Sequence, residues 1–339
     1  MRPPTVLVPL DARIGIVDEV RASTLELITL GRTLGRVDVV TLSAPSTAVL
    51  VTLSAYGVHL VHQAQLPTTL DSFAQRTTSV LGEVLTTAIR RVDADVLLAP
   101  NHVTGTEAAA VAAYKLAAGF VTDAAIACWD EQANGRVLRV TKRALSGQWL
   151  VDVEIATDPA VLTVAANSMT AAPAAVAGLA TVEPLPVEVG ALAATGVTVT
   201  GRQVREPSLS GRPELEQAAL VVCGGRGTNG NFGPIFEIAD TLGAAVGATR
   251  DVVFEGVFDR YIGQTGVTVS PRLYLGAGVS GAPHHRGGME SAAVIVAVNN
   301  DPDAPIFEFA DFGVVGDLAA MLPAAAAQIA EYRAQRDSE

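Results

Sequence analysis

The sequence is poor in cysteine, in aromatic residues and in charge. Its 339 residues include two cysteines, Cys128 and Cys223, which lie far apart and form neither a CxxC pair nor a metal-ligand spacing. A disulfide framework is therefore excluded, and a reducing compartment is favoured. The formal net charge is −12, which argues against a nucleic-acid-binding protein, because such proteins need a basic surface.

Long apolar runs are missing as well. No segment reaches the roughly 18–20 apolar residues that a membrane span requires. The apolar run near the start is too short for a signal peptide, so we expect a cytoplasmic protein. Hydrophobic residues still make up 49% of the chain, which is enough for a substantial core, and the length predicts about two domains.

The first half alternates short apolar runs with segments of helical periodicity. Strands are expected at 5–10, 37–42, 59–62 and 95–99, and helices at 21–34, 47–56, 71–91 and 106–118. This order predicts a parallel sheet covered on both faces. Four further strand candidates, 124–129, 136–141, 150–155 and 161–165, predict antiparallel additions to that sheet. The Ala-, Pro- and Val-rich composition after residue 168 predicts a linker strap up to about residue 205.

A glycine-rich turn opens the second half. The buried-strand pattern Ala219–Cys223 runs directly into Gly224-Gly225-Arg226-Gly227, and a helical pattern follows at 231–242. Such a turn lets backbone N–H groups approach a phosphate, and Arg226 would add a bidentate donor. A tight surface turn with a solvated arginine explains these residues equally well.

Polar residues also follow the next strand candidates. They are Thr249 and Arg250, then Gly263, Gln264 and Thr265, then Ser280 to His285, then Asn299, and finally Asp317. Ligands of open parallel sheets bind outside the carboxyl ends of the strands, so this pattern predicts one extended ligand with phosphates, a flat ring and a polar base. A metal site at His284 and His285 is not favoured, because no third ligand follows at a usable spacing.

The tract from Val221 to Pro323 resembles the flavin-binding domain of electron-transfer flavoprotein alpha subunits. The most similar block is LYLGAGVSGAPHHRGGMESAAVIVAVNNDPDAPIFEFADFGVVGDL, residues 273–318, and the GGRG, GATR and GQTG motifs precede it in the family's order. The first half is similar more loosely, through its strand and helix order and the segment TGTEAAAVAAYKLAAGFVTD at 104–123.

The resemblance implies an FAD site and a role for each matching residue. Arg226 would lie near the pyrophosphate, and Thr249 and Arg250 beside the isoalloxazine. Ile262, Gly263, Gln264 and Thr265 would form the loop against the ring, with the Thr265 hydroxyl on N5. Ser280, Gly281, Ala282, Pro283, His284 and His285 would wrap the pyrophosphate and ring edge, with His285 reaching the pyrimidine O2. Asn299, Asp317 and Leu318 would bind the ribose and adenine. No catalytic or metal-binding residue is implied.

The chain departs from the family pattern at the rim of this site. Tyr261-Ile262 stands where a glutamine often precedes GQTG, Val267 replaces a usual lysine, and Pro283-His284 replaces an Ile-Gln pair. These changes bear on the flavin potential and on the partner, because they remove or add charge and hydrogen-bonding groups around the ring.

The expected architecture is therefore an N-terminal parallel-sheet α/β domain with antiparallel additions, residues 1–205, followed by a doubly wound, Rossmann-like FAD-binding domain, residues 206–331, and a tail, 332–339. The resemblance implies an electron carrier, rather than an enzyme with its own substrate. It would accept electrons from partner dehydrogenases and pass them to a quinone-linked or other acceptor through flavin semiquinone and hydroquinone. It would pair with a beta subunit as a heterodimer. The alternative is a nucleotide-binding regulatory α/β module without a redox role.

Overall fold

A computed structural model describes residues 2–10, 19–70, 74–132, 135–145, 149–191, 193, 196, 199–201, 211–254, 256, 258 and 260–336. The chain divides into two compact units, of which the first holds most of the described residues up to 201 and the second those from 211 onward. Among the described helices, none is both long enough and apolar enough to cross a membrane.

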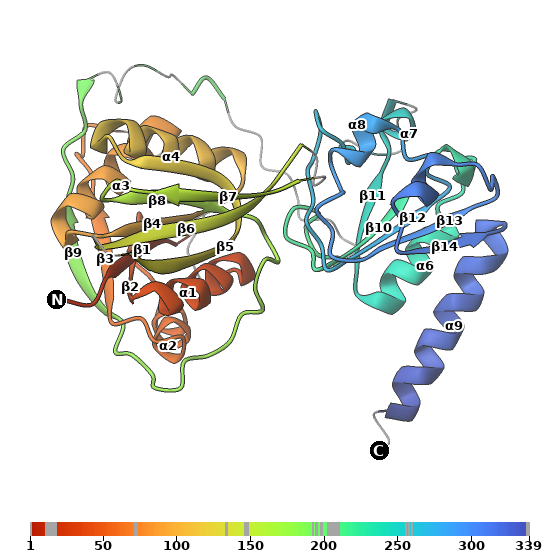
Figure 1. Cartoon of the computed structure of the whole chain (residues 1–339), viewed down its shortest axis with the longest axis horizontal. Coiled ribbons are helices and arrows are strands. Elements are labelled where there is room, and N and C mark those ends of the chain that lie inside the picture. Colours follow the sequence, from red (N-terminus) through yellow and green to blue (C-terminus); the bar gives the residue numbers. More distant parts are fainter. Residues whose placement is uncertain are drawn as a thin grey trace. The chain divides into compact units, whose positions relative to one another are not determined.

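The first unit is built on sheet A, whose strand order is β7-β6-β5-β8-β4-β1-β2-β3-β9 (Figure 1). The strands are β1 (Thr5–Pro9), β2 (Arg36–Thr41), β3 (Leu60–Gln65), β4 (Val96–Pro100), β5 (Gly119–Gln132), β6 (Gly135–Ala144), β7 (Trp149–Ile155), β8 (Ala160–Val164) and β9 (Thr181–Pro186). The helices are α1 (Ala22–Leu34), α2 (Thr47–Ala55), α3 (Thr78–Val92) and α4 (Val103–Leu116), with a 3₁₀ turn at Ala74–Arg76.

The central strands β1, β4 and β8 are buried along almost their whole length and are mostly apolar, because helices cover both faces of sheet A. Along β1, Val6 and Val8 pack with α1 and α2 in one core, whereas Leu7, between them, packs with α3 and α4 in the other. Figure 1 shows the two helix pairs on opposite sides of the sheet. The predicted parallel sheet covered on both faces is confirmed.

The additions to sheet A differ in part from the sequence prediction. β5 and β6 pair antiparallel as expected, but β8 runs parallel between β4 and β5. The predicted strap contains β9, which pairs parallel with β3 at the sheet edge. α3 begins at Thr78 rather than at residue 71, which lies outside the described residues. α4 begins at Val103 rather than at residue 106, and it is capped by His102, whose Nδ1 accepts the amide of Gly105.

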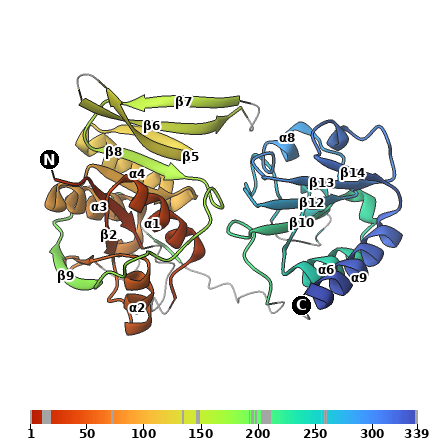
Figure 2. The ribbon, with the colours of Figure 1, turned by 60° about the horizontal axis from the view of Figure 1, so that its bottom comes forward.

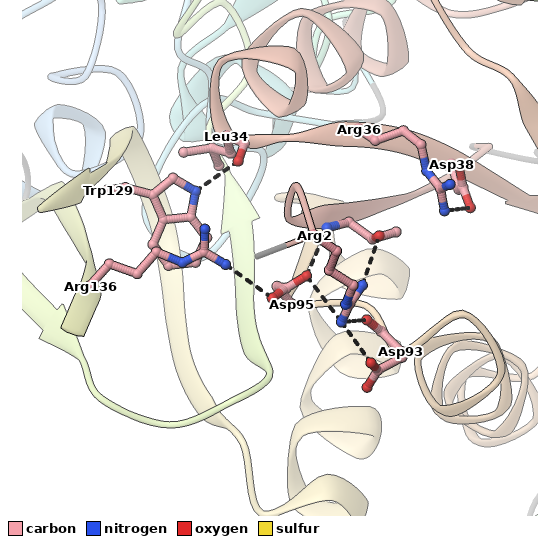
Figure 3. Close-up of polar contacts among 9 residues, drawn as sticks. Arg2, Leu34, Arg36, Asp38, Asp93, Asp95, Trp129 and Arg136 are labelled. Carbon is pink, nitrogen blue, oxygen red and sulfur yellow. Dashed lines mark hydrogen bonds and ion pairs between the residues drawn. The ribbon is translucent and has the colours of Figure 1, made fainter. Parts of the chain in front are cut away.

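A network of charged side chains fastens the amino ends of the strands of sheet A (Figure 3). The carboxylate of Asp95 accepts the backbone amide of Thr5 at 2.7 Å and lies 3.3 Å from the guanidinium of Arg136. Arg136 in turn lies over the ring of Trp129, whose indole N–H donates to the carbonyl of Leu34 at 2.7 Å. These contacts tie β1, β4, β5, β6 and α1 together, at the edge opposite the carboxyl ends.

The second unit contains sheet B, a five-stranded sheet in which all neighbouring strands run parallel (Figure 2). Its order is β11-β10-β12-β13-β14, with β10 (Leu220–Gly224), β11 (Ala245–Ala248), β12 (Leu273–Ala277), β13 (Ile295–Asn299) and β14 (Phe312–Val315). From β10 the chain crosses to β11 on one side and later to β12 on the other. This reversal makes the sheet doubly wound, as predicted, with its switch point between β10 and β12.

Helices and loops cover the two faces of sheet B differently. α6 (Gly233–Leu242) and α9 (Leu318–Arg336) pack on one face, and Figure 2 shows them on the side opposite α8 (Pro283–Arg286). The other face buries Tyr274, Ile262 and Met289 beneath loops. The remaining short elements are α7 (Arg250–Phe254) and 3₁₀ turns at Arg226–Thr228 and Pro305–Glu308. α9 continues to Arg336, so its last turn lies within the segment expected to be a tail.

Candidate functional site

The site residues predicted from the sequence lie at or next to the carboxyl edge of sheet B. Arg226 follows β10, Thr249 and Arg250 follow β11, Ser280 to His285 follow β12, Asn299 ends β13, and Asp317 and Leu318 follow β14. The loop of Ile262 to Thr265 joins this edge because the amide of Ile262 donates to the carbonyl of Ala248 at 2.9 Å. The parallel direction of the strands brings these segments to one edge, although they are far apart in the sequence.

Two glycine-rich loops meet backbone to backbone at the switch point. The amide of Gly225 donates to the carbonyl of Ala277, and that of Gly227 to Gly278, both at 3.0 Å. A Cβ on Gly225 would lie 2.2 Å from the carbonyl oxygen of Gly278, so no side chain fits there. Gly278 has a φ of +63°, which glycine adopts without strain. At the switch point between β10 and β12, the two loops therefore meet as bare backbone without side chains between them.

The loop after β12 offers unpaired backbone donors. In the described part of the chain, no hydrogen bond is made by the amides of Ser280, Gly281 or Ala282. Arg226 lies after the neighbouring strand β10 and pairs with Asp251 at 3.3 Å, with its side chain 70% exposed. Such a surface pair contributes at most about 1 kcal/mol, so the guanidinium can exchange it for a phosphate. Free amides and a movable arginine fit a pyrophosphate.

The loop of Ile262 to Thr265 is fixed to α8. The amide of Gln264 donates to the carbonyl of His284 at 2.8 Å, and the amide of Gly263 donates to Val267 at 3.0 Å. Gly263 and Gly288 approach so closely that a Cβ on Gly288 would lie 2.4 Å from the Cα of Gly263. The side chains of Gln264 and Thr265 remain exposed. The loop therefore presents two polar side chains on a rigid backbone.

His285 points into the second unit rather than into solvent. Its Nδ1 lies 3.0 Å from the carbonyl of Ile262, and its Nε2 lies 2.7 Å from the hydroxyl of Tyr274. Burial lowers the pKa of His285 to about 4, opposed by the hydrogen bond to Ile262. Both ring nitrogens are engaged within the chain, which differs from the implied contact with the pyrimidine O2. The imidazole here holds the loop of Ile262 to Thr265 in place through the carbonyl of Ile262.

Arg250 is the cation nearest the end of β11. It begins α7 and is exposed, and among the described residues no carboxylate forms an ion pair with it. The preceding amide, that of Thr249, donates to the carbonyl of Gly224 at 3.0 Å and holds this corner against β10. The guanidinium is therefore available to an anionic group at the carboxyl edge.

The residues expected at the ribose and adenine end serve partly as structural anchors. Asn299 donates to the carbonyl of Val279 at 2.9 Å and accepts the amide of Asp301 at 3.0 Å. Asp317 accepts the amide of Ala319 at 3.0 Å and caps α9. Leu318 is buried. Their side chains hold the loops of the carboxyl edge, and a ligand contact by them stays a prediction.

The sequence did not predict the side-chain contacts of two tyrosines, Tyr274 and Tyr261. Tyr274 lies wholly buried on β12 and hydrogen-bonds His285, while the hydroxyl of Tyr261 lies 2.8 Å from that of Thr265. A tyrosine within an otherwise aliphatic buried strand indicates a buried hydrogen bond, because a buried phenol needs a hydrogen-bond partner. No local pattern identifies that partner.

Comparison with known proteins decides the family. A family model described as the electron transfer flavoprotein domain matches residues 12–189, and one described as the electron transfer flavoprotein FAD-binding domain matches residues 214–290. The chain is 38% identical to the electron transfer flavoprotein subunit alpha of Mycobacterium leprae over 88% of this chain and 90% of that protein. The same subunit of Bacillus subtilis is 32% identical, over 90% and 92%.

The chain belongs to the electron transfer flavoprotein family. The subunit alpha of Mycobacterium tuberculosis, 38% identical over 94% of this chain, extends the agreement to nearly its whole length. As an electron transfer flavoprotein it binds FAD and carries electrons, and the alternative of a regulatory module without a redox role is not supported. The glycine backbones at the switch point, the free amides and the two arginines at the carboxyl edge fit that cofactor.

Proposed function

We propose that FAD lies across the carboxyl edge of sheet B, with its pyrophosphate at the switch point between β10 and β12. The observation that carries this placement is the meeting of the Gly225 and Gly278 backbones, which keeps side chains out of the switch point. The amides of Ser280 to Ala282 would donate to the pyrophosphate, and Arg226 would leave Asp251 to pair with it.

The isoalloxazine would lie against the loop of Ile262 to Thr265, near Arg250. Bound FAD supplies the electron-accepting chemistry, and the chain supplies binding and electrostatics. The Thr265 hydroxyl would hydrogen-bond N5. The guanidinium of Arg250 would favour the negative charge that reduction places on the ring, because opposite charges attract. His284 is exposed beside Gln264 and would meet the ring edge, whereas His285 supports the loop from within.

Membership of the alpha-subunit side of the family implies a heterodimer with a beta subunit. We propose that dehydrogenases donate electrons to this heterodimer and that a quinone-linked or other redox acceptor removes them. The electron-carrying role supports this, since a carrier needs a donor and an acceptor. We also propose a cytoplasmic location. The proposed domains are residues 1–205 and 206–331, followed by a tail at 332–339.

The placement is tested by FAD titration of the full-length heterodimer and of two arginine variants. Arg226→Gln removes the proposed pyrophosphate donor, and we expect the dissociation constant for FAD to rise about tenfold, as loss of one charged hydrogen bond predicts. Arg272→Gln is the matched control, because Arg272 is exposed next to the amino end of β12. Equal affinity of the Arg226→Gln variant and the control would contradict the proposed pyrophosphate site.

A further inference from the structure

Tyr261 contacts the same loop that we propose faces the flavin ring. Its hydroxyl lies 2.8 Å from Oγ1 of Thr265, and its carbonyl accepts the amide of Val267 at 2.8 Å. Between these contacts the chain turns tightly, with the amide of Gly266 donating to the carbonyl of Gly263 at 3.0 Å. Tyr261 thus holds the loop both by its backbone and by its side chain.

Two glycines make room for the phenol ring. A Cβ on Gly266 would lie 2.6 Å from Cδ2 and Cε2 of Tyr261, which is closer than real Cβ contacts allow. At Gly263 the corresponding distances are 3.4 Å, an ordinary contact. The ring therefore rests on the loop backbone, and this packing carries the hydroxyl to Thr265. The contact is built into the loop and is not an accidental approach of two surface side chains.

The chemistry of the two hydroxyls couples them to any ligand of Thr265. A hydroxyl has one donor and two acceptor positions. When Tyr261 donates to Oγ1, the proton of Thr265 is left for an acceptor on a ligand. When the ligand donates to Oγ1, Thr265 can donate to the phenol oxygen instead. The phenol accommodates both directions, so the pair can follow a change in the ligand's hydrogen-bonding character.

We propose that Tyr261 is a positioning residue for the flavin, which sets the direction and strength of the hydrogen bond from Thr265 to N5. The proposal rests on the proposed function, in which Thr265 faces the ring. Tyr261 stands where the family often has a glutamine before GQTG. The hydrogen bond between Tyr261 and Thr265 therefore distinguishes this chain from that pattern.

The direction of the effect follows from hydrogen-bond cooperativity. Donation from Tyr261 polarises the Thr265 hydroxyl and strengthens its own donation by about 10–30%. A stronger donor at N5 favours the reduced ring, because reduction adds electron density there. Removal of the phenol hydroxyl should therefore lower the midpoint potential for the first electron. The shift should be smaller than that caused by removal of the Thr265 hydroxyl itself.

The test is a double-mutant cycle on the full-length heterodimer with bound FAD, read as the midpoint potential of the first electron. The variants are Tyr261→Phe, Thr265→Val and the double substitution, and Tyr114→Phe, at an 88% exposed position, is the matched control. We expect Tyr261→Phe to lower the potential by a fraction of the Thr265→Val shift. In the Thr265→Val background it should have no further effect, because the hydroxyl through which it acts is gone.

The results that would overturn the role of Tyr261 differ from the result that would contradict the proposed function. An unchanged potential in Tyr261→Phe, or an equal shift in both backgrounds, would overturn the proposal. Loss of FAD from Tyr261→Phe would overturn it too, because the phenyl ring keeps the packing on Gly263 and Gly266. Thermal unfolding of the FAD-free heterodimer gives a second readout, in which Tyr261→Phe should match the parent protein. An unsubstituted heterodimer that binds no FAD would instead contradict the proposed function.

Discussion

The imidazole of His285 and the phenol of Tyr274 form a buried hydrogen bond of 2.7 Å inside the second unit. The carbonyl of Ile262 can only accept, so Nδ1 of His285 carries the proton and Nε2 accepts from Tyr274. Burial raises the pKa of Tyr274 well above its ordinary value, which keeps the phenol protonated as a donor. Through one neutral imidazole, this pair links β12 to the loop of Ile262 to Thr265.

His285 should make stability depend on pH. Its pKa in the folded protein is about 4, below the ordinary value of 6.5, because the charged form is buried. As the pH falls below 6.5, the unfolded chain takes up the proton first, so this contribution is full above pH 6.5 and is lost toward pH 4. Between pH 7 and pH 5 the loss is about 2 kcal/mol. Urea unfolding of the chain and of His285→Gln should show their stability difference shrinking by that amount.

The same prediction has a direct spectroscopic form. The Cε1 proton of His285, assigned by its loss in the His285→Gln variant, should show no titration in NMR spectra above about pH 5. A midpoint near 6.5 would show that the imidazole is solvated and that the pair with Tyr274 does not hold it.

Arg250 should raise the flavin potential. Replacement by glutamine removes the cation that favours the reduced ring, and we expect the first-electron midpoint to fall by about 60 mV, the equivalent of a tenfold change for one electron. The difference should narrow as salt is added, because mobile ions screen an exposed charge. Potentiometric titration of the heterodimer measures both effects, with Arg272→Gln as the control at the opposite edge of sheet B. Identical midpoint potentials in the Arg250→Gln and Arg272→Gln variants would show that Arg250 does not lie near the flavin ring.

The contact between the Gly225 and Gly278 loops should not tolerate a methyl group at position 225. In Gly225→Ala the new Cβ would lie 2.2 Å from a backbone oxygen, so the two loops must separate. We expect a loss of about 1–3 kcal/mol in stability, with weaker FAD binding. Gly233→Ala is the matched control, because its nearest contact is a side-chain oxygen at 3.2 Å. Thermal unfolding and FAD titration of both variants check this. If Gly225→Ala behaved like Gly233→Ala, the loops would not pack as described.

The charged network of the first unit should affect stability without affecting the flavin. Asp95→Asn weakens contacts to Thr5 and Arg136, and we expect a loss of about 1–3 kcal/mol. Asp93→Asn, whose side chain is 88% exposed, should cost less than about 0.5 kcal/mol. Chemical denaturation and FAD titration separate the two effects. A changed FAD affinity in Asp95→Asn would show coupling between the amino edge of sheet A and the cofactor site.

The sequence predicted the elements whose signals are local. β10 and β13 are apolar runs that end in glycine and asparagine, and β12 runs directly into Gly278, so the ends of these strands, and hence the site edge, could be placed. β9 could not be, because its two prolines and exposed positions resemble a linker, although prolines are tolerated on an edge strand. The resemblance implied a ribose or adenine contact for Asp317, and in the structure its carboxylate accepts the amide of Ala319 at the start of α9.

Contacts between residues far apart in the chain could not be predicted from the sequence. The inward orientation of His285 depends on Tyr274, 11 residues away, and on Ile262, 23 residues away. No periodicity relates these positions, so the resemblance alone assigned His285 a ligand contact. The parallel placement of β8 between β4 and β5 is likewise a property of the tertiary fold, because a fully buried strand packs equally well beside several others.

Amide hydrogen exchange of the full-length heterodimer, measured without and with FAD, tests directly whether FAD lies on sheet B. We expect FAD to protect the loops at 225–228, 262–266 and 280–285, with the largest change at the unpaired amides of Ser280 to Ala282. Peptides at the amino edge of sheet B, including Arg272, should exchange equally in both states. Protection confined to the first unit or to the beta subunit, with these three loops unchanged, would contradict the placement of FAD on sheet B.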